Sequence, residues 1–252
     1  MSGFGKIGVI GAMDSETAQL IAHLEGSRKE TFSGLDLYIG TMHGKEVTVV
    51  KCGIGKVNAA RTAQLLIDRF EPDAIVNSGI AGGTDPELSV GDTVVASGLL
   101  QHDFDLTAIG CVRGAMAGGD RTLPTIYPAD ERLVEALFTA AVRVSEGKRG
   151  GDTGSSCIPD DTTIARGIIA TGDIFVADSA TRHFIWDTFS ASATEMEGGA
   201  IAQVCSLSGI PFAVLRVLSD TADGDASESF DAFEQKTADR SAAIIEEFIS
   251  LL

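Results

Sequence analysis

The sequence is poor in the residues that mark several protein classes. Its 252 residues include four cysteines, six prolines and one tryptophan. The cysteines, at positions 52, 111, 157 and 205, form no Cys-x-x-Cys pair, so their spacing favours neither a disulfide framework nor a zinc site. The few prolines form no linker-like block, and no internal repeat divides the sequence. We therefore expect one domain over residues 1–252, long enough to enclose a substantial core.

Basic residues are scarce as well. Nineteen Lys and Arg stand against 36 Asp and Glu, which gives a formal net charge of −17. Nucleic acids bind clustered Lys and Arg, so this balance argues against a nucleic-acid partner. It favours a small neutral or cationic ligand, although the same charge also simply keeps a protein in solution.

The sequence also lacks a long hydrophobic run. The apolar stretch from Ile7 to Met13 contains Gly8 and Gly11 and is too short to cross a bilayer. No basic segment or small-residue cleavage site accompanies it, as a signal peptide would require. We therefore expect a cytoplasmic protein with reduced thiols and no membrane partner.

Strand and helix patterns alternate along the chain. Buried strands are predicted within 6–13, 73–83, 91–105, 167–178 and 210–223, and two more within 35–53 around a His-Gly turn. Helices are predicted over 14–26, 55–70, 128–147, 192–209 and 230–252. The first of these has Asp14 or Ser15 as its cap and Gly26 as its stop. This alternation predicts an α/β sandwich around a parallel or mixed sheet.

Three acidic residues lie where predicted strands end: Glu16, Glu197 and Asp220. Ligands of α/β sheets bind at the carboxyl ends of strands, and burying a carboxylate is costly unless a partner or ligand compensates. Each residue also has an ordinary structural explanation. Glu16 favours a helix N-terminus, Glu197 suits a cap, and Asp220 suits an Asx turn.

Three other motifs are weak signals. "GFGKIG" (3–8) matches G-x-G-x-x-G but precedes its strand, which argues against a dinucleotide site. "GIGKVNAA" (53–60) opens a helix after a strand, which suits close approach of a ligand to the backbone, but it lacks the full P-loop pattern. "HDFD" (102–105) suggests metal ligands, yet on a strand His102 would face away from Asp103 and Asp105. We therefore expect no metal site.

Six segments in chain order carry a resemblance: "IGVIGAMDSE", "KCGIGKVNAA", "VNSGIAGG", "ATGDIFV", "TEMEGGAIAQVC" and "VLRVLSDTAD". Together they resemble the 5′-methylthioadenosine/S-adenosylhomocysteine nucleosidase family of the purine nucleoside phosphorylase superfamily, over nearly the whole chain. The E-M-E-small run and the R-x-x-S-D-x-[AG]-D run are specific in combination. The resemblance implies a three-layer α/β/α sandwich with a central mixed sheet, usually a homodimer, and no cofactor. It also implies hydrolysis of the N-glycosidic bond of 5′-methylthioadenosine or S-adenosylhomocysteine, with release of adenine.

The resemblance also assigns roles. Asp220 matches the general acid toward adenine N7, Glu16 the residue that activates water with help from Arg216, and Glu197 the ribose ligand. Such groups stabilise the negative charge on the leaving base and the positive charge on the sugar. Glu195 is left as a supporting or structural residue. Other matched positions are Met196 near the sugar, Phe175 and Val176 around adenine, Ile54, Met13 and Phe230 along the apolar 5′ pocket, Ser219, and Leu106 and Ile109, which match positions that reach the neighbouring subunit's site.

Several alternatives stay open. Ile80 stands where the family often has Ser or Thr, and 111–130 and 148–161 look like extra loops at the entrance, so the preferred 5′ substituent is undetermined. A phosphorylase would need arginines near the Gly-rich turns, whereas this chain has Asn77 there and no Arg in "GAMDSE". An aminofutalosine or 5′-deoxyadenosine nucleosidase remains open because 5′ specificity depends on pocket shape. A nucleoside-binding module without turnover is disfavoured by the three carboxylates.

Overall fold

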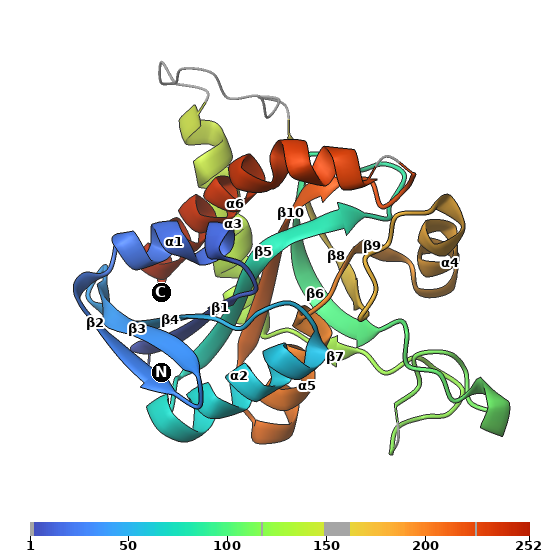
Figure 1. The fold of residues 1–252 in the computed structure, drawn as a ribbon, viewed down its shortest axis with the longest axis horizontal. Coiled ribbons are helices and arrows are strands. Elements are labelled where there is room, and N and C mark those ends of the chain that lie inside the picture. Colours follow the sequence, from blue (N-terminus) through green and yellow to red (C-terminus); the bar gives the residue numbers. More distant parts are fainter. Residues whose placement is uncertain (1–2, 117, 149–161, 225) are drawn as a thin grey trace.

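The computed structural model describes residues 3–116, 118–148, 162–224 and 226–252 (Figure 1). The predicted loop at 148–161 lies almost wholly outside the described residues. The first half of the chain forms β1 (Lys6–Gly11), α1 (Asp14–Ala22), β2 (Glu25–Phe32), β3 (Leu35–Met42), β4 (Lys45–Lys51), α2 (Lys56–Phe70), β5 (Ala74–Gly83) and β6 (Thr93–Gln101). The second half forms the short helix η1 (Thr107–Ile109), β7 (Tyr127–Pro128), α3 (Glu131–Lys148), β8 (Ile164–Thr171), α4 (Ser179–Phe189), β9 (Ala191–Glu195), α5 (Gly198–Ser208), β10 (Phe212–Asp220) and α6 (Ala226–Leu251).

The strands form one mixed sheet, part of which closes on itself. β4, β1, β5 and β10 run parallel to their neighbours in that order. β10 then pairs antiparallel with β6, β6 pairs parallel with β8, β8 pairs parallel with β9, and β9 returns antiparallel to β5. Five strands therefore make a closed ring, from which β1, β4, β3 and β2 extend. The alternation of strands and helices predicts the mixed sheet but not this closure.

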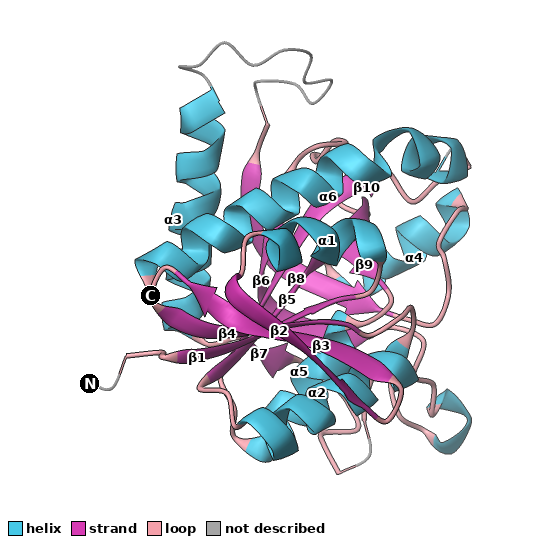
Figure 2. Cartoon of the chain, turned by 60° about the vertical axis from the view of Figure 1, so that its left-hand side comes forward, coloured by secondary structure: helices cyan, strands magenta, loops and turns pink. Residues whose placement is uncertain are grey.

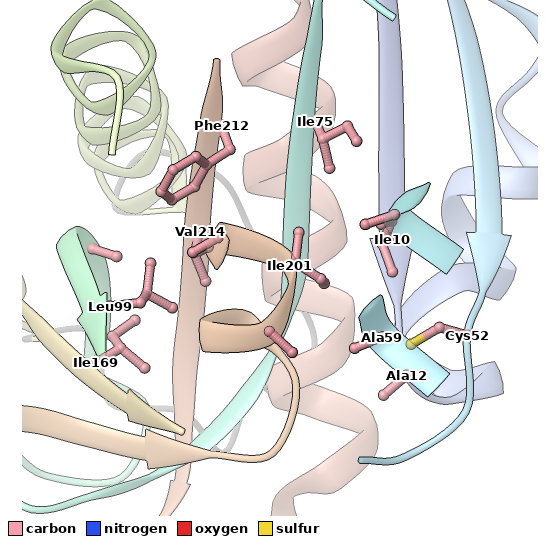
Figure 3. Close-up of a cluster of buried hydrophobic side chains, with 14 of the residues drawn as sticks. Ile10, Ala12, Cys52, Ala59, Ile75, Leu99, Ile169, Ile201, Phe212 and Val214 are labelled. Atoms are coloured by element: carbon pink, nitrogen blue, oxygen red, sulfur yellow. The ribbon is translucent and has the colours of Figure 1, made fainter. Parts of the chain in front are cut away.

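Helices cover both faces of the sheet, as the sandwich prediction requires (Figure 2). On one face α1, α3 and α6 pack together, where Ile7 and Val9 of β1 join a cluster with Phe248 of α6. On the other face lie α2 and α5, and there Ile10 and Ile201 share a second buried cluster (Figure 3). Successive strand residues point to opposite faces, so β1 serves both clusters. Among the described residues, no helix combines the length and apolarity needed to cross a bilayer.

Some predicted elements were wrong in extent. The predicted helix over 192–209 is a strand, a short turn and then α5, because β9 is buried between β8 and β5 and this pairing overrides local propensity. Helix α1 ends at Ala22 and not at Gly26, since Glu25 already begins β2. Its N-cap is Met13, which precedes both predicted caps, Asp14 and Ser15. "HDFD" follows β6 and is not part of it. Strand β2 and helix α4 were not predicted.

The packing of α6 against the sheet predicts how the loss of a buried side chain changes the free energy of unfolding. Phe248 is fully buried, so Phe248→Ala should lower the free energy of unfolding by about 3–5 kcal/mol through lost burial and a residual cavity. Urea denaturation followed by circular dichroism measures this. Leu207→Ala on α5 is the control: Leu207 is 80% exposed, so its loss should cost no more than about 0.5 kcal/mol. Equal losses in the two variants would contradict this packing.

Candidate active site

A pocket of about 600 Å³, partly open to solvent, lies where segments following β1, β4 and β8 meet the ends of β5, β9 and β10. Most of the predicted site residues line it: Glu16, Glu197, Asp220, Met13, Ile54, Phe175, Val176, Met196, Ser219 and Phe230. The three carboxylates, far apart in sequence, therefore share one cavity.

Strand pairing explains how Asp220 reaches the others. It lies beside Gly82 of β5, and Gly82 in turn lies beside Thr194 of β9. A Cβ atom at Gly82 would lie 2.7 Å from Asp220 Oδ1, so only glycine leaves room for the carboxylate. The ring of strands thus brings Asp220 to the same cavity as the segment that carries Glu197.

Glu16 is buried at the first turn of α1 and held by backbone groups. Its Oε2 accepts hydrogen bonds from the N–H groups of Ala12, at 2.6 Å, and Met13, at 3.0 Å. Its Oε1 accepts from the Ile80 N–H at 3.1 Å. Burial raises the pKa of Glu16, and the charge of Arg216 and the three backbone bonds offset this only in part. Glu16 is thus a fixed carboxylate with an increased affinity for a proton.

Glu195, which lines the pocket, and Arg216 form a buried ion pair. The Arg216 guanidinium donates to Glu195 and, at 2.6 Å, to Asn77 Oδ1. Glu195 Oε2 also accepts from the Gly198 N–H at 2.7 Å. Burial alone would raise the pKa of Glu195, but Arg216, a Thr171 hydroxyl and backbone N–H groups outweigh it and hold the pKa below its usual value. Glu195 is therefore ionised, and Arg216 contacts Glu195 directly rather than Glu16.

Glu197 is in the opposite electrostatic situation. Its Oε1 accepts from the Gly55 N–H at 2.8 Å, while its Oε2 lies 4.0 Å from the nearest Arg216 nitrogen. Burial, followed by the negative charge of Glu195, raises the pKa of Glu197 to about 8. Without a ligand, the Glu197 carboxyl group therefore holds a proton at neutral pH.

The pKa of Asp220 is raised as well. Its Oδ1 accepts from the Ala222 N–H at 2.8 Å, and its Oδ2 accepts from the Ser219 hydroxyl at 2.8 Å. Burial raises the pKa of Asp220, and these two hydrogen bonds lower it by less. A carboxyl group with a raised pKa beside a cavity can act as a proton donor.

Three predicted site residues lie outside this chain's pocket lining. Arg216 lies behind it, and Leu106 and Ile109 lie on the segment after β6, where Ile109 is 64% exposed. Ile80 and Glu195 also line the pocket, although neither was predicted as a site residue. The first glutamate of "EME" was the signal available for Glu195.

The sequence predicts no metal site, and the structure bears on this prediction only for the residues that it describes. Within them, no group of three or more His, Cys, Asp and Glu side chains is placed to hold a metal ion. Asp103 of the "HDFD" motif instead pairs with Lys56 at 2.7 Å.

Comparisons with known proteins agree with this geometry. The model of the phosphorylase superfamily matches residues 6–250. A 5′-methylthioadenosine/S-adenosylhomocysteine nucleosidase of Anoxybacillus flavithermus is 39% identical over 248 residues, which are 98% of this chain and 99% of the relative. The crystal structure of the Neisseria meningitidis nucleosidase of the same name, in complex with methylthio-immucillin-A, superposes with a TM-score of 0.86 at 33% identity, covering 98% of this chain and 100% of that one. The structure of a futalosine hydrolase mutant of Helicobacter pylori superposes with a TM-score of 0.84 at 32% identity, covering 98% of this chain and 99% of that one.

The raised pKa of Glu197 predicts how stability depends on pH. Its folded pKa of about 8 exceeds its ordinary value of 4.5, so between these values the folded chain keeps a proton that the unfolded chain has lost. The contribution of Glu197 to stability is full below about pH 4.5 and disappears as the pH rises through about 8.

The variant Glu197→Gln tests this dependence, because it keeps a neutral side chain at every pH. The ligand-free wild type should therefore lose stability relative to this variant from about pH 5 to 8. Urea denaturation across that range measures the difference, and a difference that stays constant would contradict the assignment.

Proposed function

Because this chain belongs to the phosphorylase superfamily and, within it, to the 5′-methylthioadenosine/S-adenosylhomocysteine nucleosidases, we propose that Asp220, Glu16 and Glu197 carry out its N-glycosidic hydrolysis. Water cleaves the bond between adenine and ribose, giving adenine and a 5-substituted ribose. The observation that carries this proposal is the meeting of three buried carboxylates in one pocket with apolar walls.

Asp220 is the general acid in this proposal. As the glycosidic bond breaks, its electron pair moves onto adenine, and the proton of Asp220 is transferred to N7. The raised pKa of Asp220 supports its role as a proton donor. Phe175 and Val176 flank the base, and the Ser219 hydroxyl, which donates to Asp220 Oδ2, orients the acid.

Glu16 and Glu197 act on the sugar side. Glu16 accepts a proton from the attacking water, and its three backbone hydrogen bonds fix its position. Glu197 binds the ribose hydroxyls, with Met196 beside the sugar, and its ionised form stabilises the positive charge of the transition state. Arg216 supports both carboxylates through its charge.

The charges in the pocket favour water over phosphate as the attacking group. A phosphate dianion is usually held by arginine or lysine. None of the described residues that line this pocket is Lys or Arg, and the guanidinium behind it is paired with Glu195 and Asn77. A phosphate ion would instead meet Glu16 and Glu197.

The pocket mouth suits an apolar 5′ substituent and a second subunit. Met13, Ile54 and Phe230 supply apolar walls for a thioether group. Leu106 and the exposed Ile109 extend toward the site of a partner in a homodimer. The free cysteines found in the described part of the chain, including Cys52 and Cys205, suit the reducing cytoplasm.

Release of adenine in phosphate-free buffer tests the function. The purified protein should release adenine from 5′-methylthioadenosine without phosphate and yield free methylthioribose. Added phosphate should leave the rate and the products unchanged. Release only with phosphate, with a sugar 1-phosphate as product, would identify a phosphorylase. Parallel assays with S-adenosylhomocysteine, aminofutalosine and 5′-deoxyadenosine rank the 5′ substituents.

The role of Asp220 makes a separate prediction. Asp220→Asn keeps the shape of the side chain but removes the proton that it donates, so kcat should fall by about 10²–10⁴-fold. KM should change by less than about threefold, because most contacts with the nucleoside remain. Steady-state kinetics measure both. Asp68→Asn, on the exposed face of α2, is the control and should match the wild type. A normal kcat in Asp220→Asn would contradict the assignment.

A further inference from the structure

The Asp103 side chain connects three segments that surround the pocket. It lies just after β6. Its Oδ1 forms an ion pair with Lys56 Nζ, at the start of α2, at a distance of 2.7 Å. Its Oδ2 accepts a hydrogen bond from the backbone N–H of Asp173, just after β8, at 3.0 Å. Both charged side chains are more than four-fifths buried, with exposed fractions of 17% for Asp103 and 18% for Lys56. An ion pair with these contacts is better ordered than an ordinary surface pair.

The contacts continue from Asp103 to Glu197. Asp173 Oδ1 accepts the backbone N–H of Lys56 at 2.8 Å. The preceding N–H, that of Gly55, donates to Glu197 Oε1 at 2.8 Å. Gly55 has φ +100°, and a Cβ atom there would lie 3.1 Å from Asp173 Oδ1. The turn before α2 is thus fixed from two sides, by Asp173 and by Glu197.

The charge state of Asp103 suits this arrangement. Burial would raise its pKa, but the Lys56 ammonium and the Asp173 N–H outweigh burial and hold the pKa below its usual value. Asp103 is therefore a permanent anion at neutral pH. The same segments carry Ile54 and Phe175, which line the pocket. The spacing of the pocket walls thus depends on the same contacts as the position of Glu197.

We propose that Asp103 is a positioning residue for ribose recognition: through Lys56 and Asp173 it holds the Gly55 N–H against Glu197 and so fixes that carboxyl group toward the sugar. This inference rests on the proposed function, since it assumes that Glu197 binds the ribose hydroxyls. Asp103 itself touches no substrate. Its effect reaches the sugar only through the turn at Gly55.

A double-mutant cycle tests the proposal. Asp103→Asn keeps the size of the side chain but removes the charge that holds Lys56, and kcat/KM for 5′-methylthioadenosine should fall about tenfold, mainly through KM. In a Glu197→Ala background no carboxyl group is left to position. There the same change should cost less than about twofold. An equal fold-loss in both backgrounds, or no loss in the wild-type background, would overturn the proposal.

Two further measurements separate positioning from general damage. Adenine lacks the ribose, so its affinity should be the same for Asp103→Asn as for the wild type, within about twofold. A parallel loss of adenine affinity would overturn the proposal in favour of a purely structural role. Asp36→Asn is the matched control: Asp36 also pairs with a lysine, Lys29, at 2.7 Å, but on β3 and β2, where both side chains are about half exposed.

Lys56 offers a second route if Asp103→Asn does not fold. Lys56→Met should reproduce the loss, and Lys56→Arg, which keeps the positive charge, should restore most of kcat/KM. Equal activity of these two variants would overturn the proposal. Wild-type turnover is measured in the same series. An inactive wild type would count against the function itself, whereas an active wild type with additive losses would count only against the role of Asp103.

Discussion

One buried cation, the Arg216 guanidinium, determines how Glu195, Glu16 and Glu197 can share one pocket. It pairs directly with Glu195, whose pKa is lowered as a result. Little positive charge then remains to compensate Glu16 and Glu197, and burial raises the pKa of both. Glu195 is therefore ionised, Glu197 holds a proton at neutral pH in the absence of ligand, and the pKa of Glu16 is raised, and the chemistry of the pocket depends on this distribution of charge.

This distribution suits a reaction whose charge appears only in the transition state. A permanently ionised set of carboxylates would repel one another in the empty pocket, and a fully neutral set would not stabilise a cationic sugar. Glu197 holds a proton in the absence of ligand, and positive charge that develops nearby favours its ionised form. In the proposed mechanism Asp220 meets the opposite demand, because the leaving base gains electrons.

The sequence predicts much of this site because its residues lie in short, specific runs. The segments "TEMEGGA" and "RVLSDTAD" identified Glu197, Arg216 and Asp220, and the apolar periodicity predicted β1, β5, β10 and the helices that cover them. The strand β9 was missed because "SATE" resembles a helix start, and only its burial between β8 and β5 makes it a strand. The links from Asp103 to Lys56 and Asp173 join residues distant in sequence, so local patterns carry no sign of them.

The closed ring of strands divides the site into two mechanical parts. Asp220 and Glu195 lie at the ends of strands of this ring, where Asp220 pairs with Gly82 of β5 and Glu195 pairs with Thr171 of β8, so movement of their backbone disturbs the strand pairing. Ile54, Phe175 and Phe230 lie outside the strands, on turns and at the start of a helix. Evolution can therefore change the residues that fit the 5′ substituent one at a time, while the framework that breaks the bond is inherited intact.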